Sequence, residues 1–148
     1  MPFLAPGRYV DSDHPAVIDF SQEHASGKSI RERAVSLYYA VRDGIRYNPF
    51  LDFSRPETYQ ASAVLQADEG FCVGKAALLA ACARAAGIAA RVGFADVKNH
   101  LTSPRLAETM GSDLFVYHGY TELLLDGRWV KATPAFNLAL CRRFRVRP

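Results

Sequence analysis

The sequence predicts an α+β fold, with helices in its N-terminal half and an antiparallel sheet after them. Helical segments are expected between residues 15 and 86, whereas residues 88–97, 114–125 and 128–132 are apolar runs that contain β-branched and aromatic residues. The Asp126-Gly127 dipeptide between two such runs predicts a β-hairpin. With 148 residues, of which 49% are hydrophobic and 22% charged, the chain is expected to form a single domain over residues 1–148.

Three helical segments are predicted ahead of the centre of the chain. Proline is favoured in a first turn, so a short helix is expected over Pro15–Ala25. Ser29 and Glu32 form a capping box, which opens a longer helix that ends near residue 45. Residues 46–58 are rich in Pro, Asp, Asn and Ser and should be mostly loop, and residues 62–67 should add one helical turn.

The central element is the helix that follows Gly70-Phe71-Cys72-Val73-Gly74-Lys75. Ala, Leu and Cys dominate residues 76–86, so this helix should be buried, and Gly87 should end it. The N–H groups and dipole at a helix start stabilise a thiolate, which favours Cys72 as a nucleophile. A free cysteine is more often a small buried hydrophobe, and this alternative for Cys72 stays open.

Strands are predicted over residues 88–97, 114–125 and 128–132, with a long polar connection at 98–113. A two-residue hairpin loop places Glu122 opposite Lys131, where we expect an ion pair, and Thr133 diagonally beside His118. His118 then shares the more polar face of the sheet with Tyr120 and Glu122. The other face should point to the core and carries Tyr117, Leu123, Leu125, Val130 and Ala132.

Composition and cysteine spacing exclude several classes of protein. No apolar run reaches the ~20 residues of a membrane span, and no signal peptide is recognisable, so no membrane partner is expected. Cys72, Cys82 and Cys141 are odd in number and lack a CxxC motif, which favours reduced thiols in the cytoplasm. The net charge of +3 comes from an arginine-rich end that we interpret as solvated, without a nucleic-acid partner. The oligomeric state is left open.

A cysteine nucleophile needs a base, and His118 is the best-placed candidate among the four histidines. Gly119 follows it, and a glycine within a strand often marks close approach by another backbone or a ligand. A structural histidine is the simpler alternative. A metal site built from Cys72, His100 and His118 is disfavoured because no pair has the spacing of metal ligands on a helix, and no cofactor is expected.

Several stretches resemble the transglutaminase-like proteins of the papain-like cysteine superfamily, in particular a bacterial subgroup that includes cysteine proteases. The matching motifs lie at residues 70–76, 83–92 and 117–130, and a weaker match ends in Ile45-Arg46-Tyr47. Their order and spacing carry the resemblance, which covers roughly residues 30–137.

The resemblance implies a papain-like core in which the cysteine helix packs on an antiparallel sheet. It also implies that Cys72 is the nucleophile and His118 its base. The expected activity is hydrolysis or acyl transfer at peptide or protein amides through a thioester. Backbone N–H groups at the helix start would stabilise the oxyanion with one further group, and Gln66 has the spacing for that role.

The third catalytic position departs from the family pattern. An aspartate followed by proline is expected fifteen residues after the histidine, but Thr133-Pro134 stands there. A threonine can orient an imidazole but supplies no charge, and removing the carboxylate from such a triad costs about 10⁴ in rate. Three alternatives follow from this departure. Thr133 suffices as a neutral acceptor, another group such as Asp96 or Asn137 contributes, or the protein is a catalytically degenerate scaffold acting as a binding module. We also expect relatives to continue beyond the arginine-rich tail, which would make this chain a shortened form.

Overall fold

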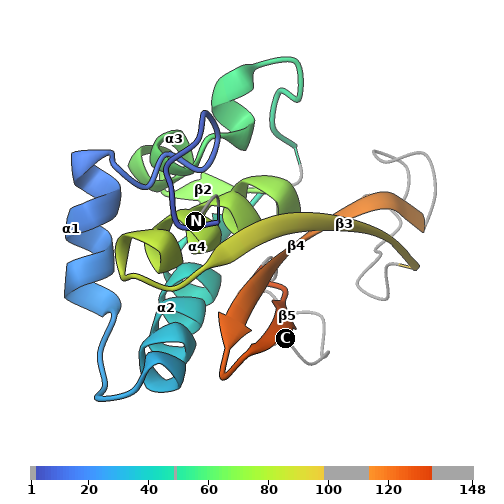
Figure 1. Ribbon diagram of the computed structural model, residues 1–148. Coiled ribbons are helices and arrows are strands. Elements are labelled where there is room, and N and C mark those ends of the chain that lie inside the picture. Colours follow the sequence, from blue (N-terminus) through green and yellow to red (C-terminus); the bar gives the residue numbers. More distant parts are fainter. Residues whose placement is uncertain (1–2, 49, 99–113, 135–148) are drawn as a thin grey trace.

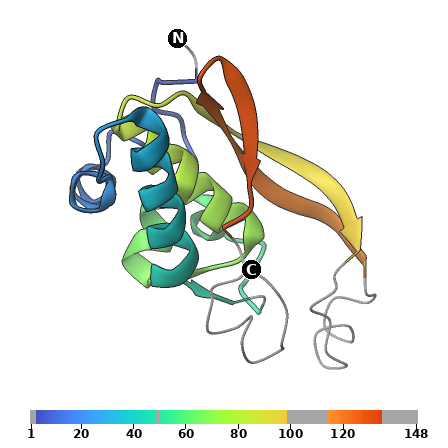
Figure 2. The same cartoon turned by 90° about the horizontal axis from the view of Figure 1, so that it is seen from below.

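Four α-helices and a three-stranded antiparallel sheet make up most of the described part of the chain, which confirms the predicted α+β class. The computed structural model describes residues 3–48, 50–98 and 114–134, with the backbone alone at 94–98 and 114–118. Figure 1 shows the helices grouped around a central helix, and Figure 2 shows the long, curved sheet as a layer along one side of the helices. The helices are α1 (Pro15–His24), α2 (Ile30–Gly44), α3 (Ala61–Ala67) and α4 (Cys72–Ala85), and the strands of the sheet, in spatial order, are β3 (Ala90–Lys98), β4 (Leu114–Leu125) and β5 (Arg128–Ala132).

Two short elements interrupt the segment that was expected to be mostly loop. β1 (Arg46–Tyr47) pairs in parallel with β2 (Glu69–Gly70), and η1 (Pro56–Tyr59) is a 3₁₀ turn. The β1–β2 pair sets Tyr47 opposite Gly70. It therefore ties the end of α2 to the residues that lead into α4. Most of the predicted polar connection, residues 99–113, lies outside the described residues.

The predicted start of α2 is confirmed. The Ser29 hydroxyl accepts a hydrogen bond from the Glu32 N–H at 3.1 Å, and the Glu32 carboxylate accepts one from the Lys28 N–H at 2.8 Å. These bonds satisfy two backbone donors at the entry to the helix. Within the described residues, no helix is both long enough and apolar enough to cross a bilayer.

Helix α4 is the centre of the core, as its composition predicts. Apart from Val73, its residues from Cys72 to Ala83 are all buried. The Thr121 hydroxyl of β4 donates to the Ala76 carbonyl at 2.8 Å, which fastens the sheet to the helix. Lys75 is fully buried, and its ammonium donates to the carbonyls of Arg42 and Ile45 at 2.9 and 2.7 Å, where α2 ends.

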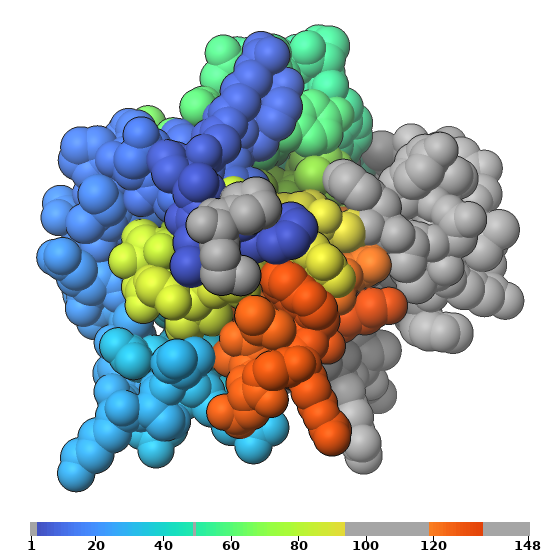
Figure 3. Space-filling view, viewed as in Figure 1, coloured from blue at the N-terminus to red at the C-terminus, as the bar shows by residue number. Residues whose placement is uncertain are grey.

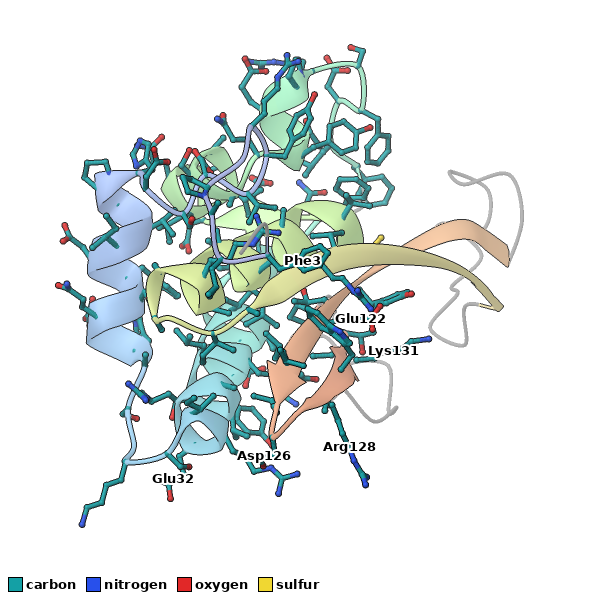
Figure 4. All side chains as sticks on the ribbon, viewed as in Figure 1. Phe3, Glu32, Glu122, Asp126, Arg128 and Lys131 are labelled. Carbon is teal, nitrogen blue, oxygen red and sulfur yellow. The ribbon has the colours of Figure 1, made fainter. Side chains whose placement is uncertain are left out.

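The predicted hairpin register is confirmed, but the predicted Glu122–Lys131 ion pair is wrong. Glu122 lies opposite Lys131 on one side and Arg91 on the other, and the ion pair forms with Arg91, at 3.3 Å between Nη2 and Oε2. Arg91 also stacks on Trp129, 3.9 Å from the ring centroid, which fixes it beside the carboxylate. The Lys131 ammonium instead lies 4.9 Å from the centroid of the Tyr120 ring. Figure 4 shows Glu122 and Lys131 side by side on the sheet.

The predicted core face of the sheet is confirmed at Leu123 and Leu125, which are buried. Ala132 packs against the same core. Val130 was also expected there, but 40% of it is exposed. Because β5 is the edge strand, Val130 borders an open groove beside α2 instead of the core. The side chain of Tyr117 lies outside the described residues.

Candidate active site

Cys72 is the first residue of α4, as the sequence predicts. The residue before it, Phe71, is extended, with φ −99° and ψ −173°, so the chain turns into the helix at the cysteine itself. Cys72 is 3% exposed and contacts Tyr47. Cys82 lies in the middle of the same helix and is fully buried. Of the two cysteines that the structure describes, Cys72 alone combines a thiol with the N–H groups of a helix start.

β4 reaches the first turn of α4 at Gly119. A Cβ atom at this position would lie 2.8 Å from the Val73 Cα atom and 3.1 Å from the Val73 nitrogen. Such contacts are too short for any side chain, so glycine is required here, as the sequence predicted for a point of close approach. Because His118 directly precedes Gly119, its backbone is one residue from this contact.

The Cys72 sulfur experiences two opposing influences. Burial raises the pKa of its thiol above the ordinary value, and this influence is the larger one. The backbone N–H groups of Gly119, Val73 and Cys72 itself lower the pKa by hydrogen bonding to the sulfur. The predicted stabilisation by the helix start is present, but burial outweighs it. The Cys72 thiol thus needs a base to remove its proton at neutral pH.

Tyr47 is the site residue that our interpretation of the motifs missed. It is 8% exposed and forms one buried cluster with Cys72, against which Phe71 and Val73 pack. Burial raises the pKa of Tyr47 well above its ordinary value, and negative charge on Cys72 raises it further. Its hydroxyl therefore keeps its proton as a hydrogen-bond donor. The Ile45-Arg46-Tyr47 motif was the available signal, but nothing in the sequence shows that β1 brings this ring to the cysteine.

The carboxylate just upstream of the cysteine is held away from it by other partners. Arg46 Nη2 lies 3.2 Å from Glu69 Oε1, and the Asn48 amide donates to Glu69 Oε2 at 2.5 Å. These contacts compensate the Glu69 charge along the β1–β2 pair. Gln66, the predicted oxyanion partner, is exposed on α3.

Thr133 directly follows β5. Its side chain is exposed, and its carbonyl accepts a hydrogen bond from the Tyr38 hydroxyl at 3.4 Å. The last described pair of the hairpin joins Ala132 to Thr121, so Thr133 is one position beyond it. The side chain of His118 lies outside the described residues, and a contact between His118 and Thr133 therefore stays a prediction.

The other residues considered for this site fall partly or wholly outside the described part. The side chain of Asp96 and all of His100 and Asn137 lie outside the described residues, so their roles also stay predictions. Across the side chains that the structure describes, no group of three His, Cys, Asp or Glu residues is placed to hold a metal ion.

Comparison with known families places this cysteine site in context. Residues 18–134 match the core model of the transglutaminase-like superfamily. The chain belongs to this superfamily. The match includes the cysteine helix, the histidine strand and Thr133, so the predicted family is confirmed.

Two solved structures share the fold. One, from Cytophaga hutchinsonii, is described as a "putative cysteine protease"; it is 21% identical, has a TM-score of 0.69, and is matched over 90% of this chain and 40% of its own. The other is the periplasmic domain of TgpA from Pseudomonas aeruginosa, 20% identical with a TM-score of 0.57, matched over 89% of this chain and 45% of its own. The transglutaminase-like chain described here thus spans less than half the length of either structure. Among curated proteins, none matches the sequence.

Proposed function

We propose that this transglutaminase-like protein is a cysteine-dependent amide hydrolase or acyltransferase, with Cys72 as nucleophile and His118 as base. The observation that carries the proposal is the position of the Cys72 sulfur, which is buried at the start of α4 where backbone N–H groups favour its thiolate. One of these N–H groups belongs to Gly119, the neighbour of His118. Cys82, in the same helix, has no helix-start N–H groups beside it and serves as an internal reference.

In the proposed reaction His118 accepts the proton of the Cys72 thiol, and the thiolate attacks an amide carbonyl carbon. Backbone N–H groups at the start of α4 would stabilise the developing oxyanion, and the protonated Tyr47 hydroxyl is the candidate for the further donor. The C–N bond then breaks, and the amine leaves with the proton from His118, which gives a thioester on Cys72. Attack by water releases a carboxylic acid, whereas attack by another amine forms a new amide, and both restore the thiol.

Thr133 would orient the His118 imidazole by accepting a hydrogen bond through its hydroxyl oxygen. A hydroxyl holds the correct tautomer but does not stabilise the imidazolium with charge, so the proposed enzyme is slow relative to one with a carboxylate there. Thr133→Asp should therefore raise the rate if this position faces His118.

The neutral residue at Thr133 also favours a second candidate, a catalytically degenerate scaffold that binds peptides. The buried, protonated thiol of Cys72 is compatible with this alternative. The two candidates differ in one property, which is whether the thiol is activated.

A library of peptide and glutamine side-chain amides, assayed with the wild-type protein and with Cys72→Ala, tests the proposal. The enzyme should release amine from some library members, and Cys72→Ala should abolish the release. Binding of library members without any release, together with equally slow alkylation of Cys72 and Cys82 by iodoacetamide, would favour the binding scaffold. The odd number and wide spacing of the cysteines favour a reducing compartment such as the cytoplasm as the site of action.

A further inference from the structure

An apolar hollow of about 490 Å³ lies beside the first two turns of α4. Volumes of this size are typical of small-molecule and side-chain pockets. The N-terminal segment, η1, α4 and β3 all contribute to it, and these elements meet on the face of the molecule shown in Figure 3. The lining residues that the structure describes are uncharged, and they are Tyr9, Val10, Tyr59, Val73, Ala77 and Val92.

The hollow begins one residue from the nucleophile. Val73 directly follows Cys72 and is the residue against which Gly119 packs. The same side chain thus belongs to the wall of the hollow and to the contact that joins β4 to α4. A peptide whose carbonyl group reaches the Cys72 sulfur therefore has the mouth of this hollow within the reach of a neighbouring side chain.

Aromatic rings extend the apolar surface to the other side of the cysteine. The Tyr59 ring lies 5.4 Å from the ring of Phe71, and the Phe53 ring lies 4.8 Å from it. Phe71 directly precedes Cys72, and 47% of Phe53 is exposed. The nucleophile is consequently flanked by apolar side chains on both sides along the chain.

The walls of the hollow are fixed by hydrogen bonds, which makes it a preformed site. The Tyr9 carbonyl accepts from the Ala61 N–H at 2.8 Å, and the Tyr59 hydroxyl donates to the Phe53 carbonyl at 2.8 Å. A Cβ atom at Gly74 would lie 2.7 Å from the Thr58 carbonyl oxygen, so η1 is seated directly on α4. A preformed pocket loses little entropy when a ligand side chain enters.

We propose that this hollow is the specificity subsite of the enzyme and takes a large apolar side chain, leucine or phenylalanine in type, from the acyl part of the substrate. The inference rests on the proposed function, because it assigns the hollow to the substrate that acylates Cys72. An acidic or basic side chain would lose its hydration there without gaining a charged partner among the lining residues. The acyl donor is thus a peptide with an apolar residue next to the reacting carbonyl.

The first measurement is the affinity of peptide aldehydes of the form acetyl-X-glycinal, where X is Gly, Leu, Phe or Glu. An aldehyde adds the Cys72 thiol as a thiohemiacetal, so its affinity reports on the hollow without depending on a leaving group. Burial of a leucine or phenylalanine side chain should make the Leu and Phe aldehydes at least about tenfold tighter than the Gly and Glu aldehydes. Equal affinities for the four aldehydes would overturn the inference but leave Cys72 as a demonstrated nucleophile.

Two variants and a matched control locate the preference. Tyr9→Ser removes one wall and should reduce the preference for Leu and Phe by about threefold or more, whereas Val92→Phe fills the hollow and should remove the preference for Phe. Tyr39→Ser removes another exposed tyrosine, which borders the groove beside α2 instead, and should leave the preference unchanged. Equal losses in Tyr9→Ser and Tyr39→Ser would also overturn the inference.

The second measurement tests binding in the hollow independently of the reaction at Cys72. Acetyl-Leu-Gly-amide is titrated into Cys72→Ala protein, and NMR follows the methyl groups of Val10, Val73 and Val92. Shifts of these methyl groups, larger than those caused by acetyl-Glu-Gly-amide, are expected. If they occur but no aldehyde forms an adduct at Cys72, the proposed function fails and the hollow remains a peptide site. If the aldehydes form an adduct at Cys72 but the methyl shifts are not selective for the leucine peptide, the hollow is not the specificity subsite, whereas Cys72 remains the nucleophile.

Discussion

Gly119→Ala places a methyl group between β4 and the first turn of α4. The added Cβ atom would lie 2.8 Å from the Val73 Cα atom and 3.0 Å from its Cγ2 atom. Favourable carbon–carbon contacts begin at roughly 3.5 Å, so strand and helix must separate by about 0.7 Å. Overpacking of this kind costs about 1–3 kcal/mol of folding free energy.

The same displacement moves the backbone of His118 away from Cys72. A misplacement of about 1 Å between reacting groups can cost about 100-fold in rate. We therefore expect Gly119→Ala to lose activity by more than its stability alone explains. Urea denaturation measures the stability, and the rate of iodoacetamide reaction at Cys72, read by mass spectrometry in the folded protein, measures the reactivity.

Gly44→Ala is the matched control. No atom of a neighbouring segment lies within 4 Å of a Cβ atom built at Gly44, the last residue of α2. This variant should be as stable as the wild type or slightly more stable, with unchanged reactivity at Cys72. If Gly119→Ala matched Gly44→Ala in both measurements, the close contact between β4 and α4 would not hold the site together.

Three further changes test the core and the site. Lys75→Met removes the ammonium that satisfies two carbonyls at the end of α2, so urea denaturation should show a loss of about 3 kcal/mol; a loss below about 1 kcal/mol would contradict this role. Tyr47→Phe removes a donor beside Cys72 and should lower kcat by about 100-fold with little change in KM, whereas an unchanged kcat would exclude the hydroxyl from the reaction. Burial raises the pKa of the Cys82 thiol to about 12, so the folded protein keeps a proton that the unfolded chain releases. The free energy of unfolding should thus fall by on the order of 3 kcal/mol between pH 9 and 12, and Cys82→Ala should flatten this fall. The same slope in the wild type and in Cys82→Ala would contradict the raised pKa of Cys82.

Local signals explain why much of the fold could be predicted from the sequence. Ser29 and Glu32 mark the start of α2 within four residues, and Asp126-Gly127 fixes the register of two strands through a single turn. The composition of residues 76–86 predicts a buried helix because few of its side chains require water. In each case the information lies within one turn of the element that it determines.

The features that could not be predicted depend on contacts between distant segments. Glu122 pairs with Arg91 because β3, far away in sequence, lies on the other side of β4. Lys75 looks like an ordinary charged residue, yet it is buried because the end of α2 presents two carbonyls to it. β1 is only two residues long, too short to show a period, and so nothing beyond the Ile45-Arg46-Tyr47 motif pointed to Tyr47, and its position at the cysteine was not predicted.

The backbone positions of the candidate site were predicted from the sequence, but its electrostatics were not. Cys72 starts the helix and Gly119 marks the close approach of β4, as expected. The direction of the thiol pKa shift, however, is the balance of burial against three N–H groups, and a sequence does not reveal how deeply a sulfur is buried. The stabilisation expected from the helix start is present but burial outweighs it, and the base therefore becomes essential to the proposed mechanism.

The most direct test is the pH dependence of Cys72 alkylation by iodoacetamide in the wild-type protein and in His118→Ala. If His118 takes the thiol proton, the wild-type rate should rise with an inflection near the pKa of histidine, about 6.5, and His118→Ala should show a rise only above about pH 9. Wild-type and His118→Ala profiles that coincide, both rising only above about pH 9, would contradict the pairing of Cys72 with His118.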